Sequence, residues 1–172
     1  YADAAIYYRV VMDAMERTAD YGLNMLEGVR QFLRNRAETY ERFSNVFRLA
    51  KRYDDSLRAL RLAQAVQPRG TRFSLPIAEV YIDQEKYAQA LEYLEKYLTE
   101  QTPQGSQAYE RLAFVLGKLG RSDEVRPRVQ AAAEKDRFNL GLQSFLGSLY
   151  EEAGEIEKAK EIYLPLLKNS PD

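Results

Sequence analysis

The chain has 172 residues, of which 45% are apolar and 30% are charged, a balance typical of a folded globular protein. Its formal net charge is −1, so it lacks the overall positive field that attracts nucleic acid or anionic membranes. The absence of Cys and His excludes disulfides and thiolate zinc sites and removes the commonest general base and metal ligand. We therefore expect no catalytic residues, no metal and no cofactor.

No apolar run reaches the roughly 20 residues that a membrane-spanning helix needs, so we expect no membrane span. The sequence begins at Tyr1 without Met and ends at Asp172, which is what a piece of a longer protein would show.

Residues 1–36 predict two amphipathic helices on either side of Gly22. Apolar residues recur there at helical spacing, at Ile6, Tyr7, Val10 and Val11 and again at Leu23, Leu26, Val29 and Leu33. Terminal units of helical-repeat proteins are often irregular, because one of their faces has no neighbouring repeat. We interpret 1–36 as a degenerate hairpin, and an unrelated capping pair of helices is the alternative.

From residue 37 the sequence repeats with a period of 34 residues and one inserted residue near Gly105. The predicted frames are 37–70, 71–105, 106–139 and 140–172. In each, the seventh and eleventh residues are large and the eighth is small: Phe43, Ser44 and Phe47; Ile77, Ala78 and Tyr81; Leu112, Ala113 and Leu116; Leu146, Gly147 and Tyr150. A small residue lets two crossing helices approach while large neighbours fill the seam, so the pattern predicts the first helix of a hairpin.

A second helix is predicted in the second half of each frame, where apolar or small residues occupy the twentieth and twenty-fourth places. These are Ser56 and Leu60, Ala90 and Leu94, Val125 and Val129, and Ala159 and Tyr163. The turn between the helices requires a residue that tolerates positive φ. Gly120 and Gly154 hold that place in the last two frames, and Lys51 and Glu85 hold it in the first two.

Helix ends and kinks are predicted from serines and prolines. Ser74 and Ser122 are expected to be N-caps. Pro76 would then lie in a first helical turn, where its missing N–H has no cost. Pro127 and Pro165 are predicted to lie deeper and to kink their helices.

These features resemble the tetratricopeptide repeat, whose 34-residue pattern runs W-x2-L-G-x2-Y, then A-x3-F, then P. The last frame matches best, through Leu146, Gly147, Tyr150, Gly154, Ala159, Tyr163 and Pro171, with Gln143 in place of the Trp. The resemblance covers 37–172 and implies an all-α fold, a right-handed superhelical solenoid of antiparallel helix hairpins. It also implies a noncatalytic scaffold that binds a peptide or partner protein in its concave groove.

The groove residues follow from the helical period, because the second, fifth, ninth and twelfth residues of a frame face away from the packing seam. The candidate partner-binding residues at these positions are Glu41, Asn45, Arg48, Arg72, Glu79, Glu110 and Phe114. Asp83 and Lys118, the thirteenth residues of their frames, and Arg111, a sixth residue, complete the candidate set. Mixed charges around a central aromatic residue are typical of a polar-rimmed peptide groove. The alternative is that each is only the solvated side of an amphipathic helix.

One subclass of the resembling family grips a C-terminal carboxylate with Lys and Asn side chains at fixed repeat positions. Asn45 and Arg111 match that set, but Glu41, Pro76 and Gln107 stand where Lys, Asn and Lys are needed. We therefore do not expect a carboxylate clamp.

Charge is unevenly distributed along the chain. Residues 30–72 include eleven Arg and Lys but only four acidic residues, a net charge of about +7. Residues 79–110 include seven acidic residues but only two Lys, a net charge of about −5. Ordinary surface solvation explains this distribution; the alternatives are an acidic partner on the first half or head-to-tail self-association. Leu164, Leu166 and Leu167 are expected to be exposed, so further repeats, or homo-oligomerisation through the terminal repeats, would cover them.

Two other functions stay open at this stage: an RNA-binding helical-repeat module, and the noncatalytic arm of a larger enzyme or assembly. RNA-binding arrays are usually basic across the groove, whereas Glu79, Asp83 and Glu110 lie in the middle of this one. We therefore expect a protein or peptide partner and no nucleic acid.

Overall fold

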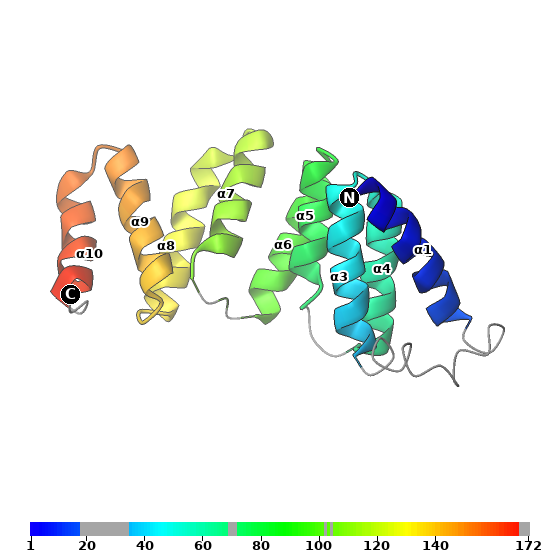
Figure 1. Cartoon of the computed structure of the whole chain (residues 1–172). Coiled ribbons are helices and arrows are strands. Elements are labelled where there is room, and N and C mark those ends of the chain that lie inside the picture. Colours follow the sequence, from blue (N-terminus) through cyan, green and yellow to red (C-terminus); the bar gives the residue numbers. More distant parts are fainter. Residues whose placement is uncertain (18–34, 69–71, 102, 104, 169–172) are drawn as a thin grey trace. The chain divides into compact units, whose positions relative to one another are not determined.

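The computed structural model describes residues 1–17, 35–68, 72–101, 103 and 105–168 (Figure 1). Within this part of the chain every regular element is helical: α1 (Ala2–Glu16), α3 (Arg36–Leu49), α4 (Tyr53–Val66), α5 (Ser74–Asp83), α6 (Tyr87–Glu100), α7 (Gln107–Lys118), the 3-10 turn η2 (Ser122–Glu124), α8 (Val125–Lys135), α9 (Leu140–Glu152) and α10 (Ile156–Lys168). The predicted all-α class is confirmed. The second helix expected within 1–36, with Leu23, Leu26, Val29 and Leu33, lies outside the described residues.

The chain divides into two compact units, Tyr1–Lys86 and Tyr87–Asp172. In the first, α3 and α4 form a hairpin, α1 packs against α3, and α5 packs against α4. In the second, α6 packs against α7, α8 against α9, and α9 and α10 form a hairpin. None of the helices described is both long and apolar enough to cross a membrane.

The α3–α4 hairpin shows why its seam needs small residues. Phe43 and Phe47 are buried on either side of Ser44, which is 3% exposed. The hydroxyl oxygens of Ser44 and Ser56 lie 2.8 Å apart, and Ser56 Oγ donates to the carbonyl oxygen of Ser44 at 2.9 Å. Because buried hydroxyls need such partners, the two serines both allow the helices to approach and bond them together.

The turns that follow α3, α5, α7 and α9 adopt the predicted left-handed conformation. Lys51 has a φ of 57° and Glu85 a φ of 58°, close to the 72° of Gly120 and the 76° of Gly154. A side chain costs about 1–2 kcal/mol in this conformation, whereas glycine adopts it freely. The turns at Lys51 and Glu85 therefore carry backbone strain that the two glycine turns avoid.

Replacing Lys51 with glycine is expected to raise the free energy of unfolding by about 0.5–1 kcal/mol, because the relief of strain exceeds the added chain entropy of glycine. Urea denaturation followed by circular dichroism measures the change. The matched control is Ala50→Gly, one residue earlier at a φ of −82°, where glycine should lower the stability. A loss of stability in both variants would contradict the explanation.

Three local predictions about helix starts were wrong. Ser74 is the first residue of α5 and Ser122 the first of η2, and neither α5 nor α8 has a side-chain cap hydrogen bond. Pro127 is the third residue of α8, so its missing N–H falls among the first four, which have no helical partner in any helix. It therefore need not kink the helix, whereas Pro165 does lie inside α10 as predicted.

Asn139 caps α9 and also holds the loop that contains the inserted residue. Its Oδ1 accepts from the backbone N–H of Leu142 at 3.1 Å and from that of Gly105 at 3.0 Å. Its Nδ2 donates to the carbonyl oxygen of Pro103 at 2.9 Å. The Asn139 side chain thus fixes Pro103 and Gly105, near the extra residue that interrupts the 34-residue period.

Candidate functional site

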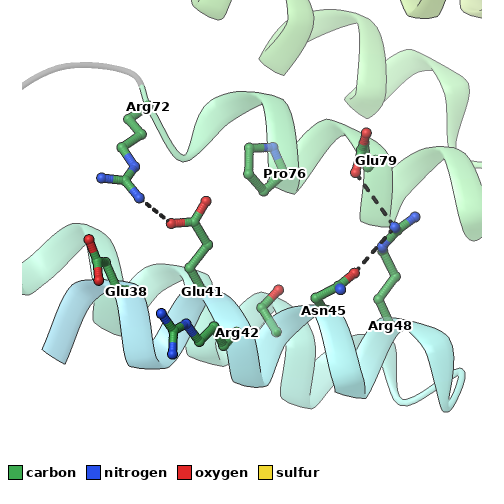
Figure 2. A pocket seen from close by; sticks show the side chains of 9 residues that line it. Glu38, Glu41, Arg42, Asn45, Arg48, Arg72, Pro76 and Glu79 are labelled. Atoms are coloured by element: carbon green, nitrogen blue, oxygen red, sulfur yellow. Dashed lines mark hydrogen bonds and ion pairs between the residues drawn. The ribbon is translucent and has the colours of Figure 1, made fainter. Parts of the chain in front are cut away.

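A hollow of about 470 Å³ lies between α3 and α5 in the first unit (Figure 2). Its lining is strongly polar and consists of Glu38, Glu41, Arg42, Ser44, Asn45, Arg48, Arg72, Pro76 and Glu79. Five of the predicted partner-binding residues are therefore brought together here. Asp83, a sixth, reaches the hollow through its ion pair with Arg48.

Arg48 closes one end of the hollow by joining α3 to α5. Its Nη1 lies 3.0 Å from Asp83 Oδ2 and its Nη2 lies 3.6 Å from Glu79 Oε2. Nη2 also donates to Asn45 Oδ1 at 3.4 Å (Figure 2). The Arg48 side chain is three-quarters buried among these groups, so its ion pairs link α3 to α5.

Arg72 closes the other end. Its Nη2 lies 2.6 Å from Glu41 Oε2, and its guanidinium lies 5.5 Å from the centre of the Phe73 ring. Figure 2 shows Glu41 of α3 and Arg72, two residues before α5, pointing toward each other. A polar space lies between this ion pair and the ion pairs of Arg48.

Arg42 and Pro76 line this space but were not among the predicted residues. Arg42 is exposed and makes no hydrogen bond or ion pair with another described residue, whereas neighbouring Glu38 accepts from Asn35 at 3.3 Å. Both missed residues are the sixth of their frames, one place after the predicted fifth. The helical period could have indicated both residues, because an exposed helix face about 100° wide includes the position next to a predicted one.

The other four predicted residues lie on α7 in the second unit. Phe114 is 46% exposed, Lys118 Nζ lies 5.4 Å from the centre of its ring, and the Tyr87 ring meets it edge-on at 6.1 Å. Glu110 accepts a hydrogen bond from Ser106 Oγ at 2.5 Å, and Arg111 is exposed on the same helix. This surface, Tyr87 with Phe114 and Lys118, offers an aromatic and cationic contact.

Much of the positive charge of the first unit is neutralised locally. Besides Arg48 and Arg72, Arg52 pairs with Asp55 at 2.5 Å, and Arg58 pairs with Asp13 at 2.8 Å and with Glu16. For those four arginines, these ion pairs favour an ordinary charged surface over an acidic partner as the explanation of the local positive charge. Arg42 differs from them because its charge is not matched by a described neighbour.

A second-unit network links α6 and α8 in a comparable way. Arg128 lies 2.6 Å from Glu95 and 2.6 Å from Glu124, which also binds Arg121. The hydrogen bond from Arg121 lowers the pKa of Glu124 below its ordinary value.

Comparison with known families gives a direct match to part of the chain. A tetratricopeptide-repeat family model matches residues 77–101 and 142–172. In these two segments the chain carries tetratricopeptide repeats. No curated protein sequence matches it significantly.

Solved structures of tetratricopeptide-repeat proteins share the fold at low sequence identity. The YrrB structure, described as "a TPR protein with an unusual peptide-binding site", superposes with a TM-score of 0.54 at 19% identity, covering 83% of this chain and 74% of that one. MamA from Desulfovibrio magneticus RS-1, from residue 41 to its end, gives 0.53 at 17%, covering 96% and 94%. PilF of Pseudomonas aeruginosa gives 0.56 at 15%, covering 99% and 79%.

Proteins of this family share a general role. Tetratricopeptide-repeat proteins are generally noncatalytic scaffolds for protein interactions, and the family match supports a role in protein interaction for this chain. A fold alone does not name a partner, so any partner must be argued from the surface.

Proposed function

We propose that this protein is a noncatalytic scaffold that binds an extended peptide segment of a partner protein in the hollow between α3 and α5. The observation that carries the proposal is that Arg42 pairs with none of the described residues, in a hollow whose other arginines have acidic partners. A peptide carboxylate is the group that best satisfies an exposed guanidinium, because the pair can form two parallel hydrogen bonds.

The remaining lining groups define the rest of the peptide. Asn45 offers amide hydrogen bonds, and Glu38 and Glu79 accept from backbone N–H groups or basic side chains. Phe114 with Lys118, in the second unit, is proposed as a separate contact for an apolar side chain and is not part of this hollow. The proposed ligand is therefore a polar peptide with an acidic residue, and nucleic acid, with phosphates that would approach these carboxylates, is not the ligand.

Arg42→Glu is expected to weaken peptide binding at least tenfold, about 1.4 kcal/mol. Peptides are first selected from a random library on the wild-type protein, and their dissociation constants are measured by fluorescence anisotropy. The selected peptides should be enriched in Asp or Glu. Replacing that acid by Lys should weaken binding to the wild type and restore binding to Arg42→Glu.

Arg61→Glu is the matched control, since Arg61 is an exposed arginine on α4 that does not line the hollow. It makes the same change in net charge and should leave the dissociation constants within about twofold. Equal weakening by both variants would mean that only long-range charge matters. Unchanged binding in Arg42→Glu would remove the hollow as the site.

A further inference from the structure

Two of the three leucines predicted to be exposed on α10 are exposed. Leu164 is 56% and Leu167 is 71% exposed, whereas Leu166 is partly covered and lines a hollow beside α8. An exposed apolar side chain does not identify what it contacts. A charged hollow is more informative, because its charges restrict the chemistry of a ligand.

A second polar hollow, of about 580 Å³, lies in the first unit beside the turn after α3 and the end of α5. Its charged and amide lining consists of Lys51, Arg52, Asp54, Asp55, Gln84 and Lys86. It shares no residue with the hollow that contains Arg42. The two hollows can therefore be altered separately.

The lining of this hollow carries an excess of positive charge. Arg52 Nη2 lies 2.5 Å from Asp55 Oδ2, so these two charges neutralise each other. The side chains of Lys51 and Lys86 are exposed and make no hydrogen bond or ion pair with another described residue. Asp54 is exposed as well, so two lysine charges remain against one carboxylate. This balance favours an anionic ligand.

Lys51 holds its charge at this hollow although glycine would relieve the strain of the turn. Its φ of 57° lies in the left-handed region, where Gly120 and Gly154 form the same turn without a side chain. The exposed Lys51 side chain has no described partner that would offset the strain. A strained residue without a structural partner indicates a functional role for its side chain.

Gln84, the C-cap residue of α5, has an amide group that lacks an acceptor. Its Nε2 is buried and makes no hydrogen bond within the described residues. Buried donors are nearly always paired, because leaving one unpaired is costly. The terminal amide of glutamine turns easily about its last torsion, so an oxygen bound in the hollow would be within reach of this donor.

We propose that this hollow binds a carboxylate side chain in an acidic segment of a partner protein. Lys51 and Lys86 supply the opposite charges, and Gln84 donates to one of the carboxylate oxygens. Asp54 repels a doubly charged phosphate more than a singly charged carboxylate, so a carboxylate is the better fit. The proposal does not depend on the hollow that contains Arg42.

The test uses a fluorescein-labelled hexaglutamate peptide and fluorescence anisotropy at low salt, where charge contacts are least screened. Every protein tested carries Arg42→Glu, so that the peptide hollow proposed above cannot account for binding. Lys51→Gly and Lys86→Gln should each weaken binding about threefold, and the two together about tenfold. Hexaglutamine, which lacks the carboxylates, should not bind.

Glu85→Gly is the matched control, because Glu85 has nearly the same strained φ, 58°, but carries no positive charge. Both glycine variants should stabilise the fold, which urea denaturation checks. Only Lys51→Gly should weaken binding, so its loss of binding cannot be due to unfolding. Arg61→Gln, which removes an exposed charge outside the hollow, should change binding by less than about 1.5-fold.

Four results would overturn the proposal. Hexaglutamate does not bind, or Lys51→Gly or Lys86→Gln leaves its binding unchanged. Arg61→Gln weakens binding as much as either lysine variant, which would mean that only long-range charge matters. Inorganic phosphate displaces the peptide at lower concentrations than acetate does, which would assign the hollow to phosphate groups instead.

Discussion

Replacing Phe47 with alanine is expected to lower the free energy of unfolding by about 3–5 kcal/mol. Phe47 lies on α3 and is fully buried, so its removal leaves a cavity in the core of the first unit that the packed helices cannot close. Urea denaturation followed by circular dichroism gives the change. A loss of this size is a large part of the roughly 5–15 kcal/mol by which a typical domain is stable.

Phe114→Ala is the matched control, because the same side chain is removed from a position that is 46% exposed. It should cost no more than about 1 kcal/mol, since much of that ring already contacts water. The pair tests the assignment of the eleventh position to the seam and of the ninth position to the surface. Similar losses in both variants would contradict that assignment.

Gly147→Ala is expected to destabilise the second unit by about 1–3 kcal/mol, although alanine favours a helix by about 1 kcal/mol over glycine. A Cβ atom at position 147 would lie 2.7 Å from Cζ of Tyr163, so the ring would have to move. The α9–α10 crossing thus depends on the missing side chain. Thermal and urea unfolding of the variant measure the cost.

The cause can be isolated with a double-mutant cycle. When Tyr163 is first replaced with alanine, Gly147→Ala should become neutral or stabilising, because the overlap is gone and only the helix preference remains. Gly117→Ala is a second control, since a Cβ there would only reach Ser122 Oγ at 3.7 Å. It should stabilise the protein. If Gly147→Ala stabilises it as well, the crossing is not as close as described.

The repeat period predicted the elements well because it records burial. Two crossing helices require a small residue at the eighth position, where they approach, and large residues at the seventh and eleventh positions, which fill the space beside it. The observed helices α3, α7 and α9 bury Phe43, Leu112 and Leu146 accordingly. The predicted caps were wrong, because Ser74 is the first residue of α5, Ser122 begins η2, and neither α5 nor α8 has a side-chain cap hydrogen bond.

The candidate site was only partly predictable. The helical period selected the face that carries Glu41, Asn45 and Glu79, but periodicity does not reveal which charges pair. Arg48 and Arg72 were predicted as partner contacts; in the structure Arg48 of α3 pairs with Asp83 of α5, and Arg72, before α5, pairs with Glu41 of α3. Arg42 was left out, yet it is the arginine of the hollow without a described partner. Whether these residues hold a peptide stays a prediction.

The sequence by itself determined the helical hairpins, their order and the positions of their turns, because each of these depends on residues within one frame. Even the strained turn at Lys51 could be foreseen, since it aligns with Gly120 and Gly154. The tertiary structure alone decided which of the described cations have acidic partners and which apolar side chains of α1 and α10 are exposed. Both depend on side chains that lie far apart along the chain and meet only when the helices pack.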